Sequence, residues 1–62
     1  MKLIVSERGR VDKLLADALP QYSRAAIHKL FSMDLIKLDG VVVKPGHKVR
    51  EGAKIEADLS PL

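Results

Sequence analysis

The chain has 62 residues and a mass of 6.8 kDa, with 11 Lys and Arg against 8 Asp and Glu, a net charge of +3 and a pI near 9.5. This length holds one small domain and leaves no room for a separate catalytic domain. Cysteine is absent, which excludes disulfides and thiolate chemistry, and no apolar run approaches the ~20 residues of a membrane span. We expect a single domain over residues 1–62 that is cytoplasmic and has no membrane partner, with residues 60–62 as a linker start or a frayed end.

The basic side chains are concentrated in the first fifty residues. Residues 1–31 carry six basic and three acidic side chains, residues 32–50 carry four and two, and residues 51–62 carry one and three. Solubility alone explains a net charge of about 2–8 on a small domain. The uneven distribution nevertheless predicts a positive face, directed toward an anionic partner, on the elements that the first fifty residues form.

The first half of the chain predicts a strand followed by two helices. Residues 2–6 alternate and are β-branched, which favours an edge strand, and residues 7–10 interrupt it. Residues 11–19 have apolar side chains at helical spacing, and Pro20 ends that helix. Ser23 is the expected N-cap of a second helix that runs to about Met33. Its apolar side contains Ala26, Ile27, Leu30, Phe31 and Met33, and its exposed side contains Arg24, Ala25, His28, Lys29 and Ser32.

The second half predicts strands. Asp34 is expected to end the second helix in a left-handed conformation. Asp39-Gly40 lies between two alternating apolar runs, which favours a type I′ hairpin over residues 36–43 with Ile36, Leu38, Val41 and Val43 on the core face. Residues 44–48 form a basic loop, and residues 54–59 alternate as a last strand. The expected fold class is therefore α+β: two amphipathic helices packed on a small antiparallel sheet with a β-hairpin.

The residues that an enzyme site requires do not converge in this sequence. His28 and His47 lie on different predicted elements, and no His, Asp and Glu cluster has the spacing of metal ligands. The four glycines are single turn residues, so no glycine-rich phosphate loop is present. We expect no catalysis in this chain, no metal, no cofactor and no small-molecule substrate.

Basic groups on neighbouring elements are the strongest functional signal. They lie at the start of the first helix, on the exposed side of the second helix, and on the hairpin and its loop: Arg10, Lys13, Arg24, His28, Lys29, Lys37, Lys44 and Lys48. Free backbone amides at a helix N-terminus, with Arg10 beside them, also favour a phosphate. Any one of these lysines is explained by solvation, but together they predict a nucleic-acid-binding face.

Several short motifs resemble, in order and spacing, the S4 RNA-binding domain. They are Arg10-Val11-Asp12-Lys13-Leu14-Leu15-Ala16, Ser23-Arg24, Ile36-Lys37-Leu38-Asp39-Gly40, Lys44-Pro45 and Val49-Arg50-Glu51-Gly52-Ala53-Lys54-Ile55. The N-terminal strand is most similar to the S4 module that begins pseudouridine synthases of the large-subunit ribosomal RNA type. This resemblance implies an S4-like fold (the alpha-L motif). It also implies that the chain is either a substrate-docking module without its catalytic domain or a stand-alone S4 protein.

The resemblance also implies which residues face RNA. They are Arg10, Ser23, Arg24, His28, Lys44 and Lys48, to which the basic pattern adds Lys13, Lys29 and Lys37. In the resemblance, Asp12 belongs to the first helix and is not a catalytic aspartate. With two aromatic residues in the chain, base stacking is not expected to supply much affinity. The predicted mode is a monomer that grips the backbone of a structured RNA, ribosomal RNA in particular, mainly through phosphates.

Two alternatives from other classes remain open at this point. A winged helix-turn-helix would bind duplex DNA through the second helix, although its exposed side has no Asn or Gln for bidentate base contacts. A protein-interaction module would use exposed Val42 and the edge of the N-terminal strand.

Overall fold

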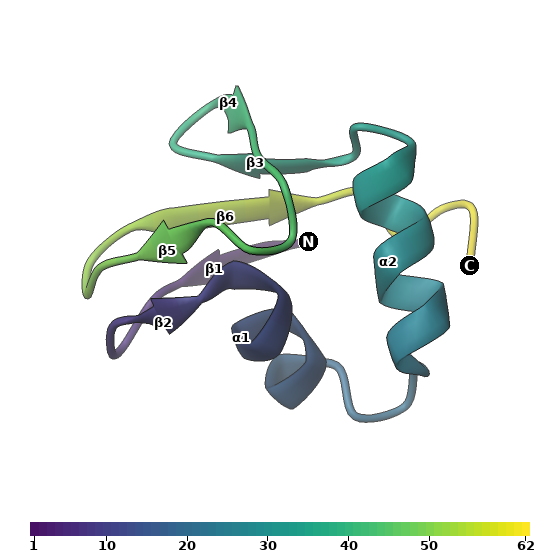
Figure 1. The fold of residues 1–62 in the computed structure, drawn as a ribbon, viewed down its shortest axis with the longest axis horizontal. Helices are drawn as coiled ribbons and strands as arrows, with labels where there is room; N and C mark the ends of the chain where they lie inside the picture. The colour runs from purple at the N-terminus through teal and green to yellow at the C-terminus, as the bar shows by residue number, and fades with distance from the viewer.

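A four-stranded antiparallel sheet, with two helices on one of its faces, forms most of the molecule in the computed structural model, which describes residues 1–62 (Figure 1). The strand order is β1-β6-β3-β4, and β2 and β5 pair as a separate two-stranded ribbon. This arrangement confirms the predicted α+β class. The elements are β1 (Lys2–Ile4), β2 (Gly9–Arg10), α1 (Val11–Ala18), α2 (Arg24–Ser32), β3 (Ile36–Leu38), β4 (Val41–Val42), β5 (Lys48–Val49) and β6 (Lys54–Ala57).

Both ends of α2 are fixed by local hydrogen bonds, as the sequence predicts. The Ser23 hydroxyl accepts the Ala26 N–H at 3.1 Å, the N-cap bond of the helix. At the other end Asp34 has φ 58, and the chain closes on the helix as the Asp34 N–H donates to Phe31 O and the Leu35 N–H donates to Leu30 O. This Schellman-type ending uses Asp where Gly is usual. Met33 lies beyond the last helical residue and is 47% exposed, so its predicted place on the apolar side is wrong.

The β3–β4 hairpin has the predicted turn and register. Asp39 and Gly40 both have positive φ, 49 and 85, and Lys37 pairs with Val42 and Leu38 with Val41. The Asp39 carboxylate also accepts the Lys54 N–H at 3.1 Å, which ties the turn to β6. Val41 pairs with Leu38 and shares its face, as predicted, but Val41 is 65% exposed and does not join the core.

Twelve apolar residues form the core, and no polar or charged residue is buried. The largest fully buried side chains come from both helices and from the two central strands: Val11, Leu15, Ile27, Leu30, Ile36 and Ile55. The core therefore joins α1 and α2 to β3 and β6, which fixes the two helices relative to each other. Neither helix has the length and apolar content required to cross a membrane.

The N-terminal ten residues pair with residues 48–57 along nearly their whole length. Leu3 pairs with Ile55 in the sheet and Gly9 pairs with Val49 in the ribbon, which is the same register on either side of a short interruption. The sequence predicts a break at residues 7–10, whereas Gly9–Arg10 forms a strand. This strand is stabilised by a partner about forty positions away, which local sequence patterns do not indicate.

The start of α1 is bonded to the loop before β5. The Val11 N–H donates to His47 O at 2.9 Å, and the Asp12 N–H donates to Pro45 O at 3.3 Å. The Lys13 N–H donates to the Asp12 carboxylate at 2.8 Å. The expectation of free amides at this helix N-terminus is therefore wrong, because the first three amides already have partners. These bonds hold the loop of residues 44–48 against α1.

Candidate nucleic-acid interface

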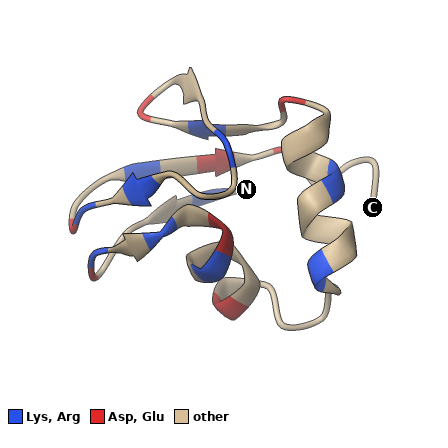
Figure 2. Ribbon diagram, viewed as in Figure 1, with Lys and Arg blue, Asp and Glu red and all other residues tan.

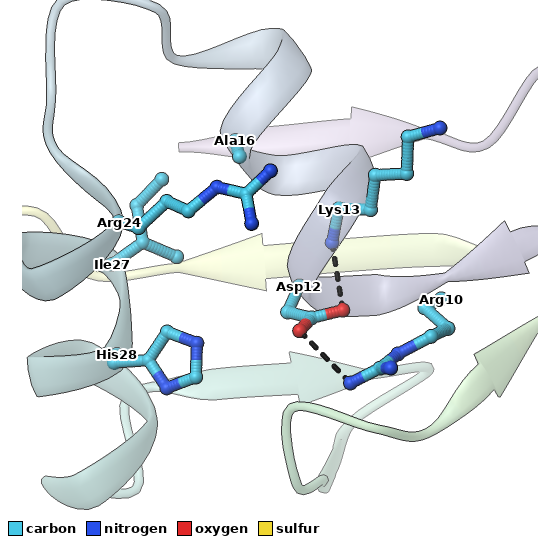
Figure 3. A pocket seen from close by; sticks show the side chains of 7 residues that line it. All are labelled: Arg10, Asp12, Lys13, Ala16, Arg24, Ile27 and His28. Carbon is cyan, nitrogen blue, oxygen red and sulfur yellow. Dashed lines mark hydrogen bonds and ion pairs between the residues drawn. The ribbon is translucent and has the colours of Figure 1, made fainter.

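A shallow hollow between α1 and α2 gathers four of the side chains that the sequence predicts to face RNA. It is lined by Arg10, Asp12, Lys13, Ala16, Arg24, Ile27 and His28 (Figure 3). Arg24 and His28 extend from α2 toward α1, whereas Arg10 extends from the end of β2 toward the start of α1. Three permanent cations thus line a hollow that contains one carboxylate, although the Lys13 side chain extends away from the other two (Figure 3).

Asp12 is the acidic group of this α1–α2 hollow, and both of its oxygens have partners within the domain. One accepts the Lys13 N–H, and the other lies 3.2 Å from an Arg10 guanidinium nitrogen. The Asp12 side chain is only 18% exposed, whereas that of Arg10 is 60% exposed. An exposed ion pair of this kind contributes about 0.2–1 kcal/mol. The pair therefore orients Arg10 while its remaining N–H groups stay available to a ligand.

A second hollow lies between the C-terminal half of α2 and the chain that follows β4. It is lined by His28, Phe31, Ser32, Asp34, Val42, Val43, Lys44 and Pro45. The His28 ring meets Phe31 edge-on, with ring centroids 6.3 Å apart. Since His28 borders both hollows, Lys44 extends the basic region beyond the α1–α2 hollow.

A third hollow lies on the β2–β5 ribbon and is lined by Arg8, Gly9, Arg10, Lys48, Val49 and Arg50. Arg10 belongs to this hollow as well as to the α1–α2 hollow, so the two adjoin. Arg8 and Arg50 are not among the predicted site residues, because the sequence around each predicts a turn. The available signal was the i, i+2 spacing of cations at 8 and 10 and again at 48 and 50.

Comparison with known protein families identifies the family of this chain. The sequence pattern of the S4 domain matches residues 9–55, which include both helices, the hairpin, the ribbon and the first half of β6. The chain belongs to the S4 domain family. No solved structure matches the chain.

Two curated relatives contain a stretch similar to this S4 domain. An uncharacterized RNA pseudouridine synthase of Aquifex aeolicus is 42% identical over 53 residues, which are 84% of this chain and 17% of that protein. A second uncharacterized RNA pseudouridine synthase, from Chloroflexus aurantiacus, is 35% identical over 52 residues, which are 84% of this chain and 16% of that protein. The chain thus spans about a sixth of the length of the relatives that it matches.

The S4 domain brings six of the nine predicted residues into one connected region. We define the basic surface as the charged and imidazole side chains that line the three hollows and favour an anion: Arg8, Arg10, Lys13, Arg24, His28, Lys44, Lys48 and Arg50. In the ribbon diagram coloured by charge, basic positions occur on α2, on α1 and along the ribbon (Figure 2). No group of three or more His, Asp or Glu side chains gathers where a metal ion could be held.

The other three predicted residues lie outside these hollows. Ser23 precedes Arg24, and its hydroxyl oxygen already accepts the N-cap bond. Lys29 is exposed on α2 but lines none of the three hollows. Lys37 is on β3, where it pairs with Val42 and Glu56 and borders a different hollow, together with Asp34 and Asp58. The structure therefore separates Lys37 from the basic surface.

Proposed function

We propose that this S4 domain binds structured RNA, ribosomal RNA in particular, and docks it as the substrate of a pseudouridine synthase. The observation that carries the proposal is that Arg10, Lys13 and Arg24 line one hollow between two helices. Because these side chains come from β2, α1 and α2, an RNA backbone already folded into a matching curve contacts them together at a lower entropic cost than a flexible strand. The names of the two relatives support the link to pseudouridine synthesis.

The chemistry of the surface favours phosphates over bases. Phe31 is buried and Tyr22 is partly buried, so the aromatic residues offer no exposed platform for stacking. Lys and Arg instead supply charge-assisted bonds to phosphate oxygens, which give affinity with little sequence readout. The RNA is thus recognised by the path of its backbone, as in a stem-loop or a junction.

The DNA alternative has weaker support. A recognition helix that reads a major groove presents side chains to base edges, commonly Asn, Gln or Arg. The exposed side of α2 carries Arg24, Ala25, His28, Lys29 and Ser32, with one guanidinium and no side-chain amide. An RNA hairpin should therefore compete better than a DNA duplex of the same length.

A salt titration with paired substitutions tests the proposal. With about four phosphates neutralised, log K should fall against log salt with a slope near −3. Arg24→Gln with Lys44→Gln should weaken binding to a ribosomal stem-loop about 10–100-fold and make the slope shallower by about 1.5. Fluorescence anisotropy across a salt series measures both quantities.

The matched control removes two charges elsewhere. Lys2 and Lys54 lie on β1 and β6, outside the three hollows, so Lys2→Gln with Lys54→Gln should leave the slope near that of the parent chain. Equal losses for the two double variants would mean that net charge alone drives binding, and the proposed surface would then be wrong. Equal competition by an unrelated hairpin would contradict the assignment to ribosomal RNA.

A further inference from the structure

Four cations line one side of the β2–β5 ribbon. Arg10 pairs directly with Lys48, and the same register continued by one residue places Arg8 opposite Arg50. Residues at i and i+2 of a strand share a face, about 6.6 Å apart, and paired residues share that face as well. All four side chains accordingly border the same hollow.

The other face of the ribbon is anchored in the core. Val49 is 3% exposed, and a Cβ added at Gly9 would lie 3.7 Å from the Leu14 side chain of α1. The backbone pairing and this packing hold the two segments together, so the four cations cannot spread by separating the strands. Like charges placed opposite each other on a ladder are destabilising.

Three of the four cations of this cluster have no ion-pair partner in the domain. The structure has two ion pairs, Arg10–Asp12 and Lys54–Glu56, so Arg8, Lys48 and Arg50 have none. Glu7 and Glu51 are exposed residues next to Arg8 and Arg50, yet neither lines the hollow. An arrangement that is unfavourable in the free protein becomes favourable when an anion lies across it.

We propose that the face formed by Arg8, Arg10, Lys48 and Arg50 is a second phosphate-binding subsite, continuous with the α1–α2 hollow through Arg10. The proposal rests on the proposed function and extends it. A bound RNA would place successive phosphates from Arg24, past Arg10, onto Lys48, Arg8 and Arg50. The separation along a strand between alternate residues is comparable with that between neighbouring phosphates of a nucleic acid strand.

An RNA backbone fits this face better than an acidic protein segment. The ribbon shares Arg10 with the α1–α2 hollow, so one continuous polyanion reaches both hollows. Guanidinium groups also bind phosphate with two parallel bonds, and three of the four cations are arginines. The ribbon subsite should therefore raise the affinity for long RNAs. It should not change the affinity for RNAs too short to extend beyond the α1–α2 hollow.

The test compares two RNAs and three double variants of the chain. One RNA is a stem-loop with a full helical turn of stem, and the other is a short oligonucleotide of the same loop sequence. For the long RNA, Arg8→Gln with Arg50→Gln should weaken binding about tenfold and make the salt slope shallower by about 1.5. For the short RNA the same variant should bind like the parent chain. The controls are Lys2→Gln with Lys54→Gln, and Arg24→Gln with Lys44→Gln.

Thermal unfolding shows whether the ribbon variant binds RNA less tightly because it has lost contacts to RNA or because it is misfolded. Because Arg8→Gln with Arg50→Gln removes like-charge repulsion, its melting temperature should rise by about 1–5 °C while its RNA affinity falls. A fall in both quantities would attribute the lost binding to misfolding and would overturn the proposal.

The remaining outcomes distinguish the two proposals. If Arg24→Gln with Lys44→Gln weakens binding and the ribbon variant matches the Lys2 and Lys54 control, the ribbon subsite is wrong and the proposed function stands. If no variant changes the affinity for either RNA, the proposed function is wrong as well. If a polyglutamate peptide binds the parent chain at the RNA's affinity and loses it in the ribbon variant, the face serves acidic protein segments, and the RNA subsite is overturned.

Discussion

The basic surface and the outer face of the sheet both carry cations, but their neighbours differ. The outer face is the side of the sheet away from the helices, formed by Lys2, Ile4, Lys37, Val42, Lys54 and Glu56. There Glu56 pairs across the strands with Lys2 and Lys37, and its carboxylate lies 3.6 Å from the Lys54 ammonium. Asp12 is the one carboxylate in the α1–α2 hollow, Asp34 is the one carboxylate in the hollow beside Lys44, and the ribbon hollow has none.

This difference shows that the number of lysines on a surface does not by itself determine whether the surface attracts an anion. Three outer-face lysines share Glu56 as a neighbour, so their field is partly cancelled at short range. The ribbon cations face one another, so their fields add. A surface is an anion site because of the acidic groups it lacks as much as the cations it has.

The largest effect is expected at Arg10, which borders two hollows. Arg10→Gln removes a charge from both and leaves the mostly covered Asp12 carboxylate without its ion-pair partner. We expect the RNA dissociation constant to rise about 10–100-fold at low salt. Lys2→Gln on the outer face should change it less than about twofold. Anisotropy titrations compare the two, and similar losses for both variants would remove the distinction between the surfaces.

A smaller and opposite effect is expected at Asp12. Asp12→Asn removes the acidic group of the α1–α2 hollow and frees Arg10, so RNA binding should tighten about 2–5-fold. The same change removes a carboxylate from the first turn of α1, which should cost about 0.3–1 kcal/mol in the free energy of unfolding. Urea unfolding and anisotropy measure the two quantities.

Asp17→Asn is the matched control for Asp12, with the same change of charge on the same helix. Asp17 lines a hollow with residues of β1 and the segment that follows it, away from Arg24 and His28. Its substitution should leave RNA affinity within about twofold of the parent chain. If both variants tighten binding equally, total charge explains the effect and the position of Asp12 does not.

The smallest effect is expected at Asp58, which borders the hollow that contains Lys37. The pKa of Asp58 is lowered below its usual 3.8, chiefly because its carboxylate accepts the Ser60 N–H. A lowered pKa means that the carboxylate stabilises the fold above pH 3.8 and that this stabilisation disappears as the pH falls through the lower folded value. Asp58→Asn should therefore lower the melting temperature slightly at neutral pH.

Melting temperatures measured at low pH show whether the charge of the Asp58 carboxylate is responsible for the difference between the variant and the parent chain. Below both pKa values the carboxyl is protonated in the folded and the unfolded chain, so the two proteins should melt together. RNA affinity at neutral pH should be unchanged, because Asp58 lies outside the basic surface. A stability difference that persists in acid would mean that the carboxylate's charge is not what stabilises this turn.

The features that the sequence predicted correctly depend on neighbouring residues. The Ser23 cap, the left-handed Asp34 and the Asp39-Gly40 turn each involve hydrogen bonds or dihedral angles within a few positions. The α+β class follows from the period of the apolar residues, which is also local. The helical and strand periods assign a residue to a face but do not say where the packed partner ends, so they do not predict that Met33 and Val41 are exposed.

The candidate site was predictable in part for the same reason. Arg24 and His28 share an exposed side of one helix, which the 100° spacing predicts, and the S4 motifs added Arg10 and Lys44. That these residues contact RNA stays a prediction, as it does for Ser23, Lys29 and Lys37. The structure instead determines which of them are neighbours, because the distance between α1 and α2 depends on the core that joins both to the sheet.

The sequence by itself determined both helices, the two ends of α2, the β3–β4 turn and the family to which the chain belongs, but it did not predict the β2–β5 ribbon. Only the tertiary structure decided that residues 8–10 lie against residues 48–50 and that β6 is a central strand. It also decided that the first amides of α1 donate to carbonyls of residues 45–47, in the loop before β5. These contacts join segments about forty residues apart, and their stability comes from burying Val49 and Ile55 in a shared core. The four cations of the ribbon are brought together by that burial, since no local preference places like charges side by side.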